Sequence, residues 1–355
     1  MRKTLFAALA VALTSSFVSA QTEVEPFVPG STIDGVTYFL PRTAFRVTIK
    51  AERTIIRPGD LYRYAERYLS MKDVPTLETM RWKIKEVKLE PFGVADPSKA
   101  FSIKLKGHTA APLVGLAADG VLLSINTDAE EEVLPELPKG IPAEALPNPR
   151  SFMTKDMLAA GSTAKLAELV AQEIYDIRES RDELIRGEAD NTPKDGEQLK
   201  LMLDRLDQQA SVLESLFRGT EQTSTEVFSM IYTPTEETDR TILFRFSEKL
   251  GVVGADDLAG APVYISCRCT ETLPAATADE QAAKKKAKMQ QGIRYNVPLR
   301  TKLKVFTLEE ELTSIEQPMG QFGEVEILSN TLFDKKTTTK VTFFQQTGSP
   351  KDILE

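Results

Sequence analysis

Apolar and polar residues alternate along the chain on both sides of its middle. Between residues 44 and 50, the apolar Phe45, Val47 and Ile49 alternate with polar residues. A period of two places these side chains on one face of a half-buried strand. Similar signals predict further strands at 35–41, 81–89, 101–106, 120–126, 225–232, 241–247, 263–269, 303–308, 324–328 and 339–344. Short strands joined by turns favour antiparallel, sandwich-like structure.

A helical period replaces this alternation in the middle of the chain. One apolar stripe runs through Ala167, Val170, Ile174, Ile177 and Leu184, and a second through Leu199, Leu203, Leu206, Ala210, Leu213 and Phe217. Gly187 and Gly219 stand where glycines end helices, and Thr192 before Pro193 predicts the N-cap of the second helix. The short loop predicts an antiparallel helical hairpin whose two stripes bury one another, as in a coiled coil.

These patterns predict an α+β protein with two β-rich, sandwich-like regions and a long antiparallel helical hairpin between them. The predicted parts are a signal peptide at 1–20, an N-terminal β-rich domain at 21–126, an acidic Pro-rich linker at 127–152, the helical hairpin at 153–220 and a C-terminal β-rich domain at 221–355. The linker, or long strap, follows from an acidic run and five prolines, since proline fixes φ and removes a hydrogen-bond donor.

The first 20 residues have the layout of a secretory signal peptide. Arg2 and Lys3 precede an Ala-rich apolar run at 5–13, and small residues close the segment at 18–20. The run is too short to span a bilayer as a helix. We expect export to the periplasm or outer cell envelope after cleavage, with no transmembrane segment in the mature chain. An N-terminal anchor helix that is never cleaved is the alternative.

Cys267 and Cys269 are the two cysteines of the chain. In an exported protein such a pair usually forms a disulfide. Here both fall on one face of the strand predicted at 263–269, roughly 6.6 Å apart, whereas a disulfide needs Cβ atoms about 3.8 Å apart. We therefore predict thiols that act as small buried apolar groups. A zinc site would need two more ligands, and His108 is the single histidine.

Composition and motifs mainly exclude classes of function. With 44 basic and 52 acidic residues, the net charge of −8 argues against a nucleic-acid partner, because phosphate contacts need a basic face. Ser162 and Lys165 match the Ser-x-x-Lys of penicillin-binding enzymes and β-lactamases. The other elements of those sites do not occur in compatible places, so we interpret Ser162 as a helix N-cap and Lys165 as an exposed lysine.

No catalytic, cofactor-binding or metal-binding residue is predicted. Glu188, Asp190 and Asp195 crowd the loop of the predicted hairpin, but they miss the ligand spacing of an EF-hand. Carboxylate pairs for glycoside hydrolysis stay open, because acids are plentiful and their separation is invisible in a sequence. Aromatic residues make up only 7% of the chain, so platforms for sugars would be sparse, and we interpret the single tryptophan, Trp82, as a core residue.

Three functions from different classes follow. The preferred one is an exported, non-enzymatic binding or scaffold module that engages an unknown envelope protein or glycan through its helical hairpin and β domains. The alternative is a carboxylate-dependent hydrolase acting on envelope glycans, which needs a concave pocket with two facing carboxylates. The third is a surface or filament subunit, which needs an exposed strand edge that another chain can pair with.

Four short motifs resemble a known family. They are Gly35-Val-Thr-Tyr-Phe-Leu-Pro-Arg-Thr43, Pro58-Gly59 followed by 64–69, Ile174-Tyr-Asp-Ile-Arg-Glu-Ser-Arg181 and Pro318-Met-Gly-Gln-Phe-Gly323. Together they resemble an exported family of Gram-negative anaerobes that is catalogued only as a domain of unknown function. The resemblance covers nearly the whole mature chain and implies an envelope location. It assigns no catalytic residues, and its motifs look like structural punctuation.

Overall fold

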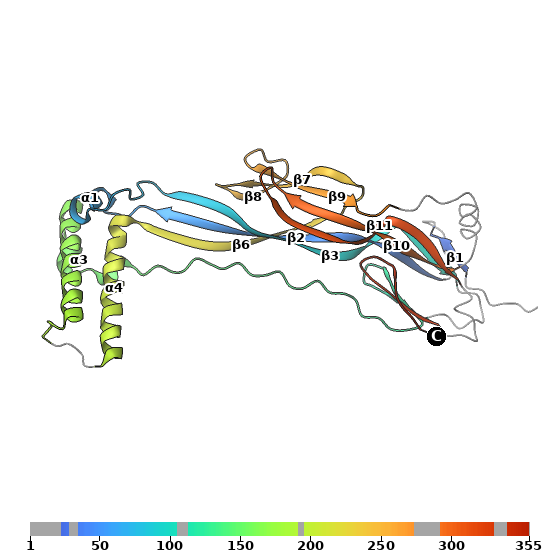
Figure 1. The fold of residues 1–355 in the computed structure, drawn as a ribbon, viewed down its shortest axis with the longest axis horizontal. Coiled ribbons are helices and arrows are strands. Elements are labelled where there is room, and N and C mark those ends of the chain that lie inside the picture. The colour runs from blue at the N-terminus through green and yellow to red at the C-terminus, as the bar shows by residue number, and fades with distance from the viewer. Residues whose placement is uncertain are drawn as a thin grey trace, which may run out of the picture.

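The computed structural model describes residues 23–27, 35–104, 113–190, 195–272, 292–329 and 339–354. The molecule is elongated, with helices at one end and the C-terminus at the other (Figure 1). The described residues form three antiparallel sheets and a pair of helices in contact with each other, which confirms the predicted α+β fold class. The predicted signal peptide at 1–20 and His108 lie outside the described residues.

The first sheet carries the long axis of the molecule. Its central strand, β2 (Gly35–Arg57), lies between β3 (Thr79–Lys104) and β6 (Thr220–Tyr232), and β1 (Glu23–Pro26) pairs with the end of β3. The strand signals that the sequence shows at 35–41 and 44–50 belong to this one strand, β2. The polar side chains of this long strand find partners on the neighbouring strands. Arg46 of β2, for example, forms an ion pair with Glu90 of β3 at 2.6 Å, and such cross-strand pairs stabilise the sheet.

β6 joins the two β-rich regions of the chain in one sheet. Residues 45–57 of β2 pair with residues 232–220 of β6 in antiparallel register, without a shift. The regions predicted at 21–126 and 221–355 therefore share this sheet.

The second sheet has five strands in the order β11-β10-β9-β7-β8. They are β7 (Thr238–Ser247), β8 (Gly251–Val253), β9 (Ala261–Cys269), β10 (Gly292–Phe306) and β11 (Glu311–Ser329). Phe45, Val47 and Ile49 of β2 are fully buried in the main core, as their period of two predicts. They share this core with residues of the five-stranded sheet, namely Phe244, Val263, Ile265, Leu303 and Val305.

The third sheet lies at the end of the molecule opposite the helices. Its order is β13-β12-β5-β4, with β4 (Val114–Leu116), β5 (Leu122–Ile125), β12 (Lys340–Phe343) and β13 (Pro350–Leu354). Strands from both β-rich regions of the chain thus complete it. Tyr38 of β2 is buried in the core there, its hydroxyl accepts a hydrogen bond from the Arg294 amide at 2.9 Å, and burial raises its pKa above the usual value.

The helices gather at the other end. They are η1 (Tyr62–Tyr64), α1 (Ala65–Leu69), η2 (Pro149–Phe152), α2 (Lys155–Leu158), α3 (Thr163–Arg186) and α4 (Gly196–Arg218). The predicted hairpin is confirmed as α3 and α4, and Gly187 ends α3 with a φ of 72°. The predicted N-cap Thr192 is wrong, because Asp195 caps α4 by accepting from the Glu197 amide at 3.0 Å. Thr192 itself lies outside the described residues.

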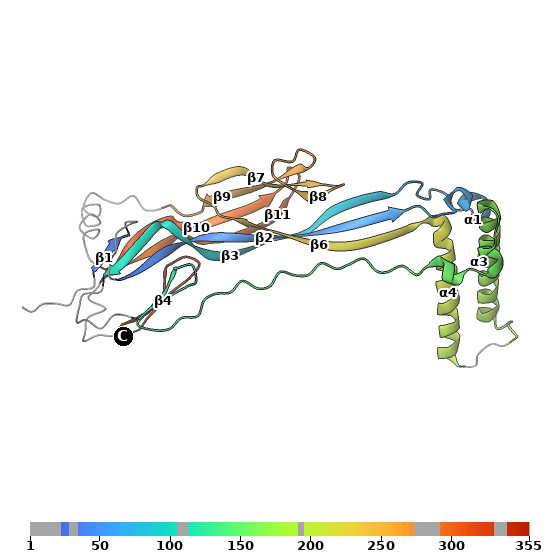
Figure 2. The same ribbon diagram turned by 180° about the vertical axis from the view of Figure 1, so that it is seen from behind.

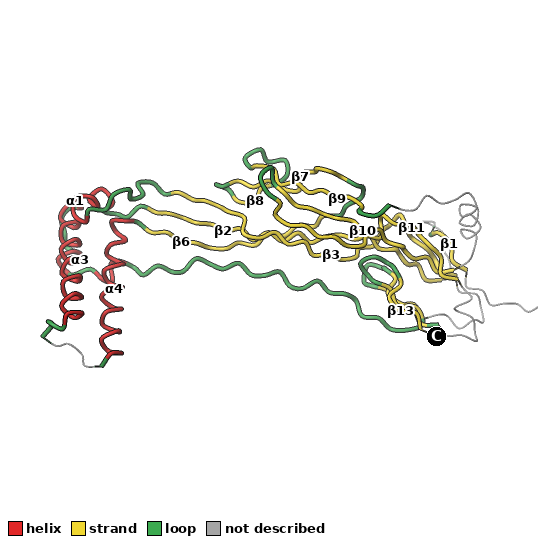
Figure 3. Tube along the Cα trace, viewed as in Figure 1, coloured by secondary structure: helices red, strands yellow, loops and turns green. Residues whose placement is uncertain are grey.

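Residues 127–148, here called the strap, return along the body from the third sheet to the helices (Figures 2 and 3). The strap contains no helix or strand, as its prolines predict. Few contacts hold it. Ile141 forms an antiparallel bridge with Thr225, and the Glu132 amide donates to Gln345 Oε1 at 2.6 Å.

A buried polar junction connects β2, β10 and β11 with the turn after β12. Asn296 of β10 is fully buried, and its Nδ2 donates to the carbonyl oxygens of Pro41 and Thr347, both at 2.9 Å. Gln321 of β11 holds the backbone of Thr43, accepting from its amide at 2.8 Å and donating to its carbonyl at 2.9 Å. Buried carbonyls need such donors, so these amides fix how the strands meet.

We predict that Asn296→Ala lowers the free energy of unfolding by about 1–3 kcal/mol, because two buried carbonyls lose their donor. Denaturant unfolding followed by circular dichroism measures this. The matched control is Gln172→Ala, which removes an exposed bond to Asp176 and should change stability by less than about 0.5 kcal/mol. Equal stability of the two variants would contradict the role of the junction.

Candidate functional site: the helical end and its neighbouring cavities

The helical end has a hydrophobic core of its own. The predicted stripe of α3 is buried throughout, at Ala167, Val170, Ile174, Ile177 and Leu184. The stripe of α4 is buried at Leu213 and Phe217 but only partly covered at Leu199, Leu203, Leu206 and Ala210. Leu61 and Ala65 complete the core near the sheet. Coverage of the α4 stripe therefore decreases from the sheet toward the free end of the hairpin.

Polar contacts set the register of the two helices. Arg178 pairs with Glu214 at 2.8 Å, and Arg181 pairs with Asp207 at 2.7 Å. Each exposed pair contributes at most about 1 kcal/mol, so their role is mainly to align α3 and α4. Tyr175 connects α3 to α1, because its hydroxyl donates a hydrogen bond to the Tyr68 carbonyl at 2.8 Å.

The free end of the hairpin exposes three large apolar side chains, here called the hairpin tip. Ile185 near the end of α3 is 55% exposed, and Leu201 and Met202 near the start of α4 are 60% and 41% exposed. The Arg181–Asp207 pair implies that Ile185 and Met202 lie at a similar height in the antiparallel pair. Both helices project from the long axis of the molecule (Figure 1). The tip is therefore remote from the sheets.

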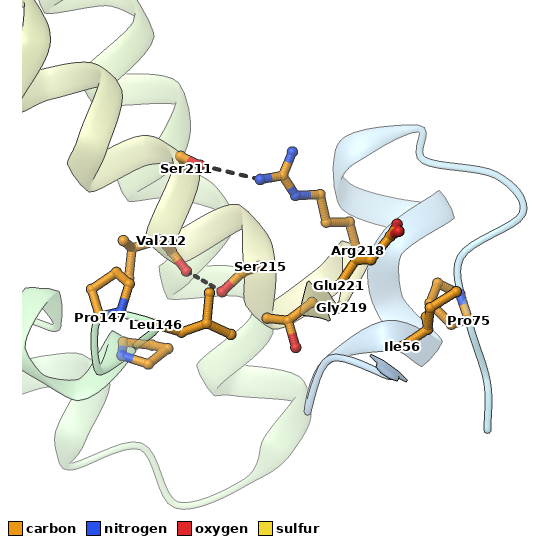
Figure 4. Close-up of a pocket in the computed structure, with 12 residues that line it drawn as sticks. Ile56, Pro75, Leu146, Pro147, Ser211, Val212, Ser215, Arg218, Gly219 and Glu221 are labelled. Atoms are coloured by element: carbon orange, nitrogen blue, oxygen red, sulfur yellow. Dashed lines mark hydrogen bonds between the residues drawn. The ribbon is translucent and has the colours of Figure 1, made fainter. Parts of the chain in front are cut away.

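A cavity of about 670 Å³ lies where the end of α4 meets the strap and the ends of β2 and β6 (Figure 4). Its apolar wall consists of Ile56, Pro75, Leu146, Pro147, Pro149 and Val212. Arg218 and Ser211 form its polar side, with the guanidinium donating to the serine hydroxyl at 3.1 Å. Among the described lining residues, Glu221 is the single carboxylate. This lining suits binding and offers no pair of carboxylates.

A second cavity of about 750 Å³ lies beside β2 and β3, next to the turn between β10 and β11. Its wall contains five carboxylates, those of Glu52, Glu221, Glu248, Glu309 and Glu310. Glu52 is engaged by Lys85 at 3.0 Å. Trp82 also borders the cavity, but it is buried beneath Gly251 and its ring is tilted against that of Phe228, with centroids 6.2 Å apart, which confirms the core interpretation.

Ser162, Lys165 and Glu188, which the sequence singles out, have structural partners. Ser162 accepts from the Lys165 amide at 3.2 Å, so it is an N-cap as interpreted. Lys165 pairs with Glu168 at 3.1 Å. Glu188 pairs with Arg186. Within the described ranges, no group of three or more His, Cys, Asp or Glu side chains could hold a metal ion.

Residues 34–351 match the family described as domain of unknown function (DUF4831). The chain belongs to this family. No curated protein and no solved structure matches the chain. The family resemblance read from the sequence motifs is thereby confirmed, and its implications for export and source stay predictions. None of the helices described for this DUF4831 protein is long and apolar enough to cross a membrane.

The family motifs Gly35–Thr43 and Pro318–Gly323 of this DUF4831 protein meet in the buried polar junction. A side chain at Gly323 would collide with the Val297 carbonyl, so only glycine permits this approach of the strands. Lys99 reaches the junction, 3.4 Å from Asn296 Oδ1, and burial lowers its pKa. Sequence reasoning missed this cluster. The glycines on either side of Gln321 in the sequence were the signal that could have indicated a close approach of strands there.

Both cysteines of the DUF4831 protein are free, as predicted. Cys267 is fully buried in the main core, and burial raises the pKa of its thiol to about 12. Cys269 is only partly covered, 3.7 Å from the Thr301 hydroxyl, and burial raises its pKa as well. Neither side chain has the thiolate character that redox chemistry needs.

We expect the folded DUF4831 protein to resist alkylation by iodoacetamide at mildly alkaline pH, because the thiolate is the reacting form. Cys267 should stay unlabelled and Cys269 should react more slowly than a free thiol. Both should label once guanidinium chloride unfolds the chain. Arg268 lies between the cysteines, so tryptic peptides report each one separately by mass spectrometry. Equal labelling of Cys267 before and after unfolding would contradict its buried, protonated state.

Proposed function

We propose that this DUF4831 protein is an exported, non-enzymatic binding or scaffold protein of the cell envelope that engages a protein partner through its hairpin tip. The observation that carries the proposal is the exposure of Ile185, Leu201 and Met202 at the end of helices that project from the body. Large apolar side chains that are exposed at the outer end of projecting helices are typical of interaction sites.

The energetics favour a small protein interface at the tip. Full burial of one Leu, Ile or Met side chain is worth about 1.5–3 kcal/mol. Three such side chains would supply a central apolar contact of the kind that dominates interface energies. Acidic residues outnumber basic ones in the neighbouring sequence, where Glu183, Glu197 and Asp204 are acidic and Arg186 and Lys200 are basic. A partner surface with an apolar groove and basic edges would match this chemistry.

Export rests on the pattern of residues 1–20. We expect a periplasmic or outer-envelope location, with the mature chain beginning at Gln21. Expression of the full chain in a Gram-negative host, followed by fractionation and N-terminal peptide mass analysis, measures both. A cytoplasmic protein that keeps residues 1–20 would contradict export, and a membrane-bound protein that keeps them would favour the anchor-helix alternative.

The cavity lined by five glutamates favours one second candidate, a carboxylate-dependent hydrolase of envelope glycans. Concavity and several carboxylates are what such an enzyme requires. Against it, the Trp82 ring is buried rather than open to a sugar, and Glu52 is held by Lys85. Glycan turnover by the purified protein that Glu309→Gln abolishes would establish this alternative.

For the hairpin tip, we predict that Leu201→Glu weakens partner capture about tenfold or more, since one buried leucine is worth more than the 1.4 kcal/mol of a tenfold change. Quantitative in-cell cross-linking with mass spectrometry of recovered partners measures it. The matched control is Leu258→Glu, a loop position with 83% exposure. At least one partner should be lost with Leu201→Glu and kept with Leu258→Glu. Identical partner sets would remove the tip from the proposal.

A further inference from the structure

Along the outer edge of β6, every second residue directs its backbone N–H and C=O groups away from the sheet. β6 is the last strand in the order β1-β3-β2-β6, and its pairing with β2 has no register shift. Thr225 faces outward, because it donates to the Ile141 carbonyl at 2.8 Å and accepts from the Ile141 amide at 2.9 Å. Backbone direction alternates along a strand. Val227, Ser229 and Ile231 therefore also direct their N–H and C=O groups outward.

The strap covers only part of this edge. Gly140 passes so close to β6 that a side chain there would meet the Thr225 carbonyl. Continued antiparallel pairing would place Pro135 opposite Ile231, and proline has no N–H to donate. Among the described residues, the outward backbone groups of Val227, Ser229 and Ile231 have no hydrogen-bond partner. The edge beyond Thr225 is thus open.

The side chains of this edge do not oppose pairing. No charged residue occurs from Val227 to Thr235, and Ile231 is 69% exposed. Exposed edges are usually protected by charges, prolines or bulges. The outer edge of β3 carries such protection in Lys83, Lys85, Lys88 and Pro91, and the edge strand β11 contains Pro318. Val227–Tyr232 lacks these features.

We infer that Val227–Tyr232 is a binding site for an extended strand of another protein, which adds to the sheet antiparallel to β6. The strap gives the orientation, because the incoming strand continues the line that the Ile141–Thr225 bridge begins. The uncharged edge calls for a segment without charges over about five residues and with β-branched or aromatic side chains at alternate positions. This surface is separate from the hairpin tip and extends the proposed function.

The probe is a fluorescent peptide with the sequence Val-Phe-Ser-Met-Ile-Tyr of residues 227–232, carrying a lysine-containing tail for solubility. This sequence is uncharged and carries β-branched or aromatic side chains at four of its six positions. Fluorescence anisotropy with the full mature chain should show saturable binding. In the complex, hydrogen exchange of the Val227, Ser229 and Ile231 amides should slow, because each gains an acceptor on the incoming strand.

Two variants test the geometry. Ser229→Pro removes one outward N–H and leaves the bonds to β2 in place, since proline is tolerated at an outward position of an edge strand. Ile231→Lys adds the type of charge that protects β3. Each should weaken peptide binding at least tenfold, whereas Leu258→Lys, a matched change on a remote exposed loop, should not. Circular dichroism and thermal unfolding check that every variant is folded.

Two results would overturn the inference. The first is that the peptide does not bind the wild-type chain, and the second is that Ile231→Lys and Leu258→Lys bind it equally well. Sedimentation identifies the occupant: a wild-type chain that self-associates, and is made monomeric by Ile231→Lys, would show that a second copy fills this edge instead of a foreign strand. Leu201→Glu should bind the peptide normally, so failure of the hairpin proposal and failure of this one are distinguishable.

Discussion

The pairing of β2 with β3 on one side and with β6 on the other is the constraint on which the rest of the structure depends. β2 has backbone partners along both edges over 45–56. A shift of one residue would move Phe45, Val47 and Ile49 off the core face, so burial specifies this register strongly. Because β6 follows α4 directly in the chain, the same register also sets where the hairpin begins and how far it stands from the second sheet.

Local periodicity was sufficient to predict the helices and strands but not to predict which strands pair with one another. A period of 3.6 located α3 and α4, and alternation located the buried face of β2, because both patterns reflect burial within one element. The pairing of β2 with β6 joins residues 163 or more positions apart, and no local pattern encodes it. Asp195 capped α4 in place of Thr192, since both residues can accept from helix amides and only the chain path decides.

Part of the candidate site could likewise be predicted from the sequence and part could not. The hairpin follows from its stripes, but the tip does not, because Leu201 and Met202 lie off the stripe of α4 and their exposure depends on how far the other elements reach. The polar junction around Asn296 and Gln321 could not be predicted, since an isolated Asn or Gln gives no sign of which distant carbonyl it will meet. The fold thus combines one long sheet, a projecting hairpin and an unprotected edge on β6, which supports a role in binding.

The central claim is that both β-rich regions form one cooperative body through β2 and that the outer part of the hairpin is only lightly held. Native-state hydrogen exchange tests this most directly. The account predicts that amides of 45–57 share the slowest exchange class with partners in β3, β6 and β10, and that the free ends of α3 and α4 exchange faster. Separate opening of the regions before 127 and after 220, with β2 and β6 exchanging independently, would contradict it.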